Sequence, residues 1–345
     1  MKIRQVESSD RDAWNDFVSE THHALRYEWS EIIEKTFSHK PLYLIAENEK
    51  GIAGILPLFL FKSSLFGKSM ISVPYLNAGG AFGSPEACIE LLTRSIAIAS
   101  NHKVKYLEFR HQANFAECFS KKTVRQHKVS MELRLTEDEQ TMFSSFPAKL
   151  RSQIRRPLKE GAELQTWQGH NSCSQAIDDF YTVFSENMRD LGTPVYPKKL
   201  FSQTMKQFGK NAAITVCYLD KQPAAAGLTV TNGHSREIVW ASSLKKFNRQ
   251  SPNMALYWEI IRQAILSKDK IFDFGRSSPD GGTYKFKQQW GAFPVQLNWH
   301  YHSFSGDIPD VNPKNSKYEY IVRMWQRLPL PLANIVGPLL SQHLP

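Results

Sequence analysis

Four ionisable side chains surround one glycine-rich turn, in the segment FDFGRSSPDGGTYKFKQQWGA at residues 272–292. Asp273 lies at the end of a strand-like apolar run, Arg276 follows three residues later, and Lys285 and Lys287 come after the turn. The glycines allow tight turns and close backbone approach. Prearranged cations stabilise the negative charge that develops on a reacting carbonyl oxygen. The segment predicts a site that orients an amine and holds negative charge, and the structural alternative is an Asp273–Arg276 ion pair that fixes the turn.

The secondary structure after the turn decides whether the two lysines act together. Lys285 and Lys287 lie two residues apart, so they share a face on a strand but not on a helix. Before the turn, the strand pattern puts Asp273 on one face and Phe272 and Phe274 on the other.

A second group of cations lies in KLRSQIRRPLKEG, residues 149–161. Its cations are Lys149, Arg151, Arg155, Arg156 and Lys159. Three of them are spaced at i, i+4 and i+8, which makes one basic stripe on a helix. Pro157 is expected to kink or interrupt this helix, and Gly161 to end it. The stripe predicts a phosphate-binding edge for tRNA, a nucleotide-linked substrate or a polyprenyl phosphate, with a solvated helix face as the alternative.

The composition is that of a basic globular protein. The 345 residues include 43 Lys and Arg against 33 Asp and Glu, a net charge of +10, and 41% are hydrophobic. This excess favours an anionic partner such as a nucleic acid, a phosphorylated substrate or an anionic membrane surface. The four cysteines form no C-x-x-C pair, so we expect no metal, no disulfide framework and no tightly bound cofactor.

Two histidines alternate with aromatic residues in VQLNWHYH. His300 and His302 fit a period-two strand, on which both imidazoles share a face. We expect that face to be exposed and polar rather than metal-binding, because no third ligand is evident.

The same succession of elements occurs twice along the chain. Strand-like runs between residues 42 and 61, and again between residues 214 and 232, predict antiparallel hairpins. A serine followed by proline, at Ser84 and again at Ser251, then predicts a capped helix start. Each helix leads to a strand that ends in an acid, a phenylalanine and an arginine. The matching residues are Gly54 and Gly227, Ser84 and Ser251, Glu108 and Asp273, and Arg110 and Arg276.

Because these pairs occur in the same order at nearly constant offset, we predict a duplicated α/β (α+β) fold. Each domain is expected to be a mixed, mostly antiparallel sheet flanked by helices. The predicted domains are residues 1–140 and 141–310, and residues 311–345 form a C-terminal helix and a Pro-rich apolar tail. The tail either docks on the protein or contacts a membrane surface, and we favour docking.

Several motifs resemble the FemAB-like acyltransferases of the GNAT superfamily, including the FemAB-type proteins associated with exopolysaccharide and PEP-CTERM systems. The matching motifs are NMRDLGTPVYP at 187–197, VWASS at 239–243, PNMALYWE at 252–259 and the FK-x-x-W-G ending of the first segment. The resemblance covers most of residues 42–301. It implies tandem GNAT-like folds and an enzyme that forms amide bonds by attack of an amine on an activated carbonyl.

The resemblance also assigns roles to residues. Lys287, in the FK motif, would lie at the reacting ester and stabilise the oxyanion. Asp273 and Arg276 would organise the site, with Asp273 as the first candidate for the base. Substrate-binding candidates are Lys149, Arg151, Arg155, Arg156, Tyr196, Ser242, Asn253, Tyr257, Trp258 and Lys285. For Tyr257 and Trp258, core packing is the alternative role.

The acyl donor is expected to be a co-substrate, and it is either aminoacyl-tRNA or acyl-CoA. The R/Q-x-x-G-x-G/A loop of ordinary GNAT enzymes is absent, and so is the helical arm of Fem ligases that use tRNA. The expected acceptor is an amine of a cell-envelope, peptidoglycan or exopolysaccharide precursor. We expect a cytoplasmic enzyme whose C-terminal tail is a candidate for peripheral contact with the inner membrane. The alternative is a non-catalytic duplicated scaffold that binds an anionic polymer or a nucleic acid.

Overall fold

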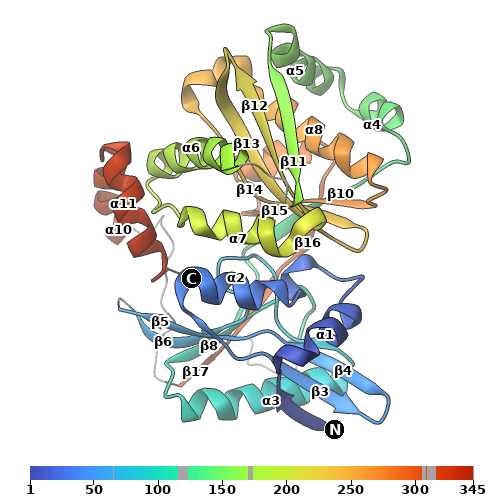
Figure 1. The fold of residues 1–345 in the computed structure, drawn as a ribbon, viewed down its shortest axis with the longest axis vertical. Coiled ribbons are helices and arrows are strands. Elements are labelled where there is room, and N and C mark those ends of the chain that lie inside the picture. The colour runs from blue at the N-terminus through green and yellow to red at the C-terminus, as the bar shows by residue number, and fades with distance from the viewer. Residues whose placement is uncertain (65, 116–122, 170–173, 305–307, 309–315, 345) are drawn as a thin grey trace. The chain divides into compact units, whose positions relative to one another are not determined.

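The computed structural model divides the chain into two compact units. The first comprises Met1–Val129, Val295–Val311 and Gln342–Pro345, and the second comprises Ser130–Pro294 and Asn312–Ser341. The structure describes residues 1–344 except 65, 116–122, 170–173, 305–307 and 309–315. Both units combine mixed sheets with flanking helices, which confirms the predicted α/β fold class (Figure 1).

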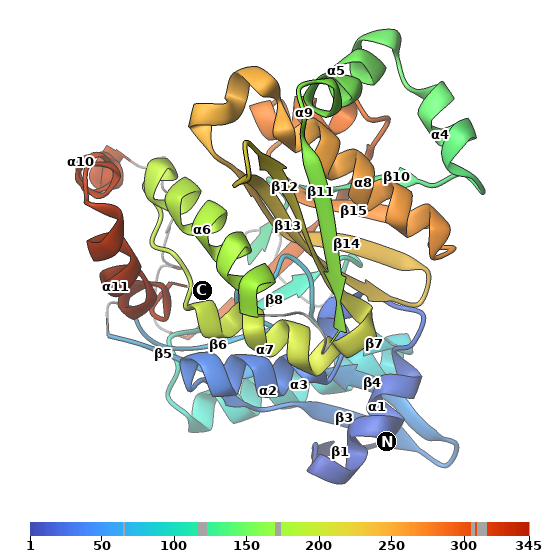
Figure 2. The ribbon, with the colours of Figure 1, turned by 45° about the horizontal axis from the view of Figure 1, so that its top comes forward.

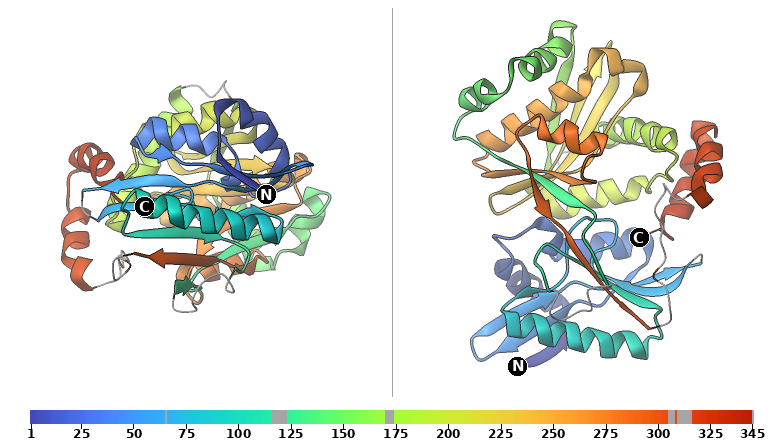
Figure 3. Two further views of the ribbon diagram at one scale, coloured as in Figure 1. Left: turned by 90° about the horizontal axis from the view of Figure 1, so that it is seen from below. Right: turned by 180° about the vertical axis from the view of Figure 1, so that it is seen from behind.

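The described residues of the first unit form two sheets and three α-helices. One sheet has the order β1 (Lys2–Gln5), β3 (Leu44–Asn48), β4 (Gly51–Leu56), β7 (Phe82–Gly83). The other has the order β2 (Lys40–Pro41), β5 (Phe59–Ser63), β6 (Gly67–Ile71), β8 (Tyr106–His111), β17 (Asn298–Ser303), β9 (Val124–Arg125). The helices are α1 (Arg11–Phe17), α2 (Glu28–Phe37) and α3 (Pro85–Asn101). Helix α3 runs along the strands (Figure 3) and buries Leu91 against Leu44, Leu56 and Leu107.

The second unit is built on one seven-stranded sheet. Its order is β11 (Glu163–Gln168), β12 (Ala212–Leu219), β13 (Gln222–Asn232), β14 (Ser235–Ser243), β15 (Ile271–Ser277), β10 (Val129–Arg134), β16 (Phe293–Gln296). The helices are α4 (Glu139–Ser145), α5 (Ala148–Lys159), α6 (Ser174–Leu191), α7 (Lys198–Phe208), α8 (Pro252–Leu266), α9 (Gly282–Gln288), α10 (Ser316–Gln326) and α11 (Leu330–Ser341). Helices α6 and α8 lie on either side of the central strands (Figure 2).

Both predicted hairpins form, and their matching glycines serve the same purpose. Strands β3 and β4 pair antiparallel, as do β12 and β13. A Cβ on Gly54 would lie 2.7 Å from the Cβ of Ala87 in α3. A Cβ on Gly227 would lie 3.0 Å from Ile260 in α8. In each unit, glycine lets the hairpin approach the helix that follows.

The two predicted helix starts differ in their capping. Ser84 accepts a hydrogen bond from the Ala87 amide at 3.2 Å, as predicted for an N-cap. The prediction of a capping bond at Ser251 is wrong, because Ser251 adopts a left-handed conformation with φ 55° and its side chain makes no capping bond. The 3₁₀ turn at Lys245–Gln250 leads directly into α8 and sets this conformation.

Strand β17 lies in the first unit although it follows the second along the chain. It pairs antiparallel with β8 and with β9, so it is an inner strand. The expectation of an exposed face for His300 is therefore wrong: this side chain is fully buried, and its Nδ1 lies 3.0 Å from Nδ1 of His111. His302 stays partly exposed.

Candidate functional site

The segment after the glycine-rich turn is helical, and this separates the two lysines. Helix α9 extends from Gly282 to Gln288. Lys285 is exposed, whereas Lys287 is only 7% exposed. The shared face that a strand would have given them is absent, because residues two apart point in different directions on a helix.

Lys287 is held against the end of β15. Its Nζ donates to the carbonyl oxygen of Gly275 at 2.8 Å and to that of Arg276 at 3.0 Å. Gly275 has φ +74°, a left-handed conformation at the end of the strand that side chains of L-residues rarely adopt. An ammonium group has three N–H donors. The two carbonyls therefore fix the ammonium and leave one donor for a ligand.

The surroundings of Lys287 tune its charge. Burial lowers the pKa of Lys287 to about 8, while the carboxylates of Asp273 and Glu237 oppose this shift and Arg276 adds to it. The amine is therefore mostly protonated at neutral pH but close to its titration. A poorly hydrated cation of this kind interacts strongly with developing negative charge.

Asp273 shapes the turn rather than facing solvent. It is 2% exposed, and its Oδ1 accepts hydrogen bonds from the Ser130 hydroxyl at 2.6 Å and the Gly275 amide at 2.7 Å. These bonds orient the strand end whose carbonyls hold Lys287. Arg276 is exposed beside it, and the Asp273–Arg276 ion pair stays a prediction.

A cavity of about 180 Å³ lies in the second unit, and Lys287 is not among the residues that line it. Its lining residues are Asn187, Ala241, Ser242, Ser243, Asn253, Leu256, Tyr257 and Phe286. Strands β14 and β15 pair in parallel as far as Glu237 and Asp273. Beyond these residues, Ala241, Ser242 and Ser243 of β14 line the cavity. Phe286 lines the cavity, and the next residue, Lys287, reaches β15.

Three predicted substrate-binding residues meet in this cavity: Ser242, Asn253 and Tyr257. The ring of Tyr257 stacks on Phe274 with centroids 5.5 Å apart, and burial raises the pKa of its hydroxyl. Five lining residues were not predicted: Asn187, Ala241, Ser243, Leu256 and Phe286. Asn187 donates to the Ser242 hydroxyl at 3.0 Å. All five lie inside the motifs quoted for the family resemblance, and that was the signal available in the sequence.

Two other aromatic candidates lie away from the cavity lining. Trp258 packs against Phe143, with centroids 5.0 Å apart, and against Phe146. This is core packing against α4. The ring of Tyr196 stacks on that of Phe184 with centroids 6.4 Å apart. Tyr196 and Trp258 therefore stay substrate-binding candidates by prediction alone.

The predicted basic stripe is a helix, α5, with several exposed cations. Lys149, Arg155, Arg156 and Lys159 are exposed. Arg151 instead donates to the carbonyls of Phe146 and Ser144, and Arg155 lies over the Phe143 ring. The expected interruption at Pro157 is wrong, because the helix continues to Lys159.

The matching acid and arginine of the first unit form a closed pair. Arg110 Nε and Glu108 Oε1 are 2.7 Å apart, and both side chains are buried. The guanidinium also donates to the Leu76 carbonyl and lies over Trp299. These contacts use the arginine structurally, so the candidate site is the one in the second unit.

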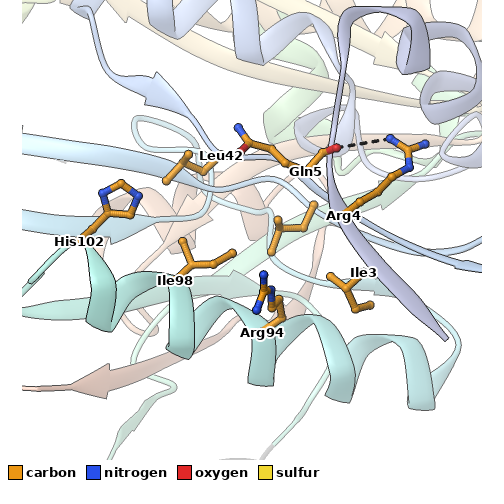
Figure 4. A pocket seen from close by; sticks show the side chains of 8 residues that line it. Ile3, Arg4, Gln5, Leu42, Arg94, Ile98 and His102 are labelled. Carbon is orange, nitrogen blue, oxygen red and sulfur yellow. Dashed lines mark hydrogen bonds between the residues drawn. The ribbon is translucent and has the colours of Figure 1, made fainter.

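A second cavity, of about 190 Å³, lies on the first unit and contains none of the predicted site residues (Figure 4). Ile3, Leu42 and Ile98 supply apolar walls. Arg4 lies at its edge, but its guanidinium is paired with Asp10 and Glu47. Arg94 and His102 also line it.

Residues 148–288 match the model of the acetyltransferase (GNAT) domain family. Within these residues lie α5, the cavity and Lys287. The chain carries a GNAT domain. A further relative, the UDP-N-acetylmuramoylpentapeptide-lysine N(6)-alanyltransferase of Weissella viridescens, is 24% identical over 168 residues, 47% of this chain and 48% of that protein. The chain thus matches about half the length of this curated relative.

Solved structures extend the likeness beyond the GNAT domain to most of the chain. FemX matches with a TM-score of 0.65 and 13% identity, covering 86% of this chain and 97% of that one. The tandem GNAT protein from the clavulanic acid biosynthesis pathway matches with a TM-score of 0.57 and 10% identity, covering 89% and 99%. Together these findings support a FemAB-like GNAT family, and the solved structures confirm the tandem GNAT-like fold.

Proposed function

We propose that this protein is an aminoacyltransferase that forms an amide bond on an amine of a cell-envelope precursor. The observation that carries the proposal is the buried ammonium of Lys287, which two carbonyls fix and which follows directly after Phe286 of the cavity lining. The alanyltransferase relative favours an aminoacyl donor and a peptidoglycan-type acceptor. Acyl-CoA as donor and an exopolysaccharide precursor as acceptor are the variants of the same reaction, and the experiment below separates the two donors.

Lys287 acts on the carbonyl oxygen of the donor. The amine of the acceptor attacks the ester carbon, and the electron pair of the C=O bond moves to oxygen, where the free N–H of Lys287 donates. When the C=O bond reforms, the ester C–O bond breaks. The leaving hydroxyl takes a proton and the former amine loses one, so atoms and charge balance. The burial of Asp273 argues against it as the base and for a positioning role.

The surroundings suit such a donor. The cavity is lined by neutral polar groups, Asn187, Ser242 and Asn253, which suit the amine and carbonyl of a small aminoacyl group. The exposed cations of α5 suit a phosphate backbone or a phosphorylated carrier. We place the reaction in the cytoplasm, where charged tRNA and acyl-CoA are made.

The test is product formation with each donor separately. Purified protein is incubated with an amine-bearing envelope precursor and either aminoacyl-tRNA or acyl-CoA, and products are read by mass spectrometry. We expect a mass gain with aminoacyl-tRNA that Lys287→Met abolishes. Lys285→Met is the matched control, because Lys285 lies on the same helix but is exposed. A gain that survives Lys287→Met refutes the assigned role.

The second candidate is a non-catalytic scaffold that binds an anionic polymer or nucleic acid. The exposed cations of α5 favour it. In that case, no donor gives product, and Arg155→Gln with Lys159→Gln weakens polymer binding while Lys287→Met does not.

A further inference from the structure

The last two helices expose a concentrated set of large apolar side chains. On α10 these are Tyr320, Ile321 and Met324, exposed by 73%, 59% and 55%. On α11 they are Leu332, Ile335, Val336 and Leu339, exposed by 50%, 65%, 38% and 60%. Half of the large apolar side chains that are exposed among the described residues lie on these two helices. We call these seven residues the outer apolar face.

Helix α11 turns its small side chains toward the protein and its large apolar side chains outward, the reverse of an ordinary surface helix. It buries the small residues Ala333, Gly337 and Ser341, spaced at i, i+4 and i+8. A Cβ on Gly337 would lie 2.8 Å from Val195, so glycine is needed for this docking. A helix that only completes a core buries its leucines and isoleucines. Here they point outward instead, so docking on the protein does not account for them.

Helix α10 continues the same arrangement. Its Trp325 is buried and its Val322 packs against Gly192, where a Cβ would lie 2.4 Å from the valine. Tyr320, Ile321 and Met324 lie on the other side. Both helices lie at the margin of the second unit beside α6 (Figures 1 and 2). Leu191, at the end of α6, adds a further side chain that is 57% exposed.

The charges around the outer apolar face are mainly positive. The sequence of α11 contains no ionisable residue. Arg323 and Arg327 are exposed on α10 and just after it. Glu319 on α10 pairs with Arg323 at 2.6 Å, and Asp190 lies 3.5 Å from the Lys245 ammonium, so three cations face two carboxylates here. Lys245 lies close by, since its Nζ and the side chain of Gln326 both donate to the Asp190 carbonyl. Apolar side chains bordered by exposed cations match the interface of an anionic bilayer, where aliphatic groups enter the acyl region and cations contact phosphates.

We infer that the outer apolar face binds the surface of an anionic membrane, with Tyr320 at the headgroup level. None of the described helices is long and apolar enough to cross a membrane, so the contact is peripheral. A second copy of the chain is the competing occupant, and self-association is one of the outcomes of the test below. The inference does not depend on the transferase activity.

The test is flotation of the full chain with vesicles of phosphatidylcholine alone or mixed with phosphatidylglycerol. We expect binding to the mixed vesicles, weakened by salt and by Arg323→Gln with Arg327→Gln. The double variant Ile335→Gln and Leu339→Gln should lower vesicle affinity about tenfold or more. Controls are Ile89→Gln and Leu266→Gln, whose side chains are 49% and 56% exposed on other helices, and these should bind like the wild type.

Three outcomes would overturn the inference. They are no binding of the wild-type chain to either vesicle, binding that Ile335→Gln with Leu339→Gln leaves unchanged, and self-association of the wild type that this double variant abolishes without any vesicle binding. Circular dichroism of each variant checks folding. Transfer to a water-soluble precursor should be the same in the double variant, which separates this inference from the proposed function.

Discussion

The buried ammonium of Lys287 should leave a measurable signature in the pH dependence of stability. Its pKa is about 8 in the folded protein against 10.5 for an unperturbed lysine. Between these values the unfolded chain binds more protons, so the free energy of unfolding rises with pH in this range. Below about pH 8 the folded protein bears the cost of a buried charge.

The magnitude follows from the shift. The full change corresponds to about 3 kcal/mol, of which about 2.5 kcal/mol appears between about pH 7 and about pH 10. Other titrating groups also contribute in this range, so the quantity to compare is the difference between wild type and Lys287→Met. That difference removes every contribution the two proteins share.

The assay is denaturant unfolding of wild type, Lys287→Met and Lys285→Met over this pH range. We expect the wild type to gain about 2.5 kcal/mol relative to Lys287→Met as pH rises, and Lys285→Met to follow the wild type because Lys285 is exposed. A difference between wild type and Lys287→Met that stays constant with pH would show that Lys287 titrates like a solvated lysine. The reasoning that makes it a desolvated oxyanion donor would then fail.

Three further predictions concern activity and packing. The rate of transfer should fall as pH rises through about 8, measured at saturating donor, because Lys287 must be protonated to donate; a flat profile through this range would contradict the role. Gly227→Ala should lower the free energy of unfolding in denaturant by about 1–3 kcal/mol, since its Cβ would lie 3.0 Å from both Ile238 and Ile260. Gly282→Ala, whose Cβ would have nothing within 4 Å, should leave that free energy nearly unchanged. Burial lowers the pKa of His39 to about 4, so the unfolded chain binds more protons below neutral pH. Relative to His39→Phe, the wild type should therefore lose about 2 kcal/mol of stability from about pH 8 to about pH 5; a difference between the two proteins that stays constant with pH would contradict this.

The local pattern of the sequence was enough to predict the duplicated elements. Alternation, turn residues and helical spacing are properties of short segments, so the hairpins, the helices after Ser84 and Ser251 and the strand before the glycine turn were all predicted. Lys287 was singled out by its place in a family-like motif. The sequence alone showed that Gly54 and Gly227 occupy equivalent positions in the two units. Only the structure shows why glycine is needed there: a helix packs so closely on each that a Cβ would collide with it.

The tertiary structure decided which residues share an environment. Helix α9 buries Lys287 and exposes Lys285, and the packing of α6 on β14 brings Asn187 beside Ser242. His300 is buried because its strand lies between two partners from distant parts of the chain. Burial and cavities depend on contacts between residues far apart in sequence, and no local periodicity encodes those partners. For the same reason, the outward face of α11 became evident only when the helix was seen docked by its small residues.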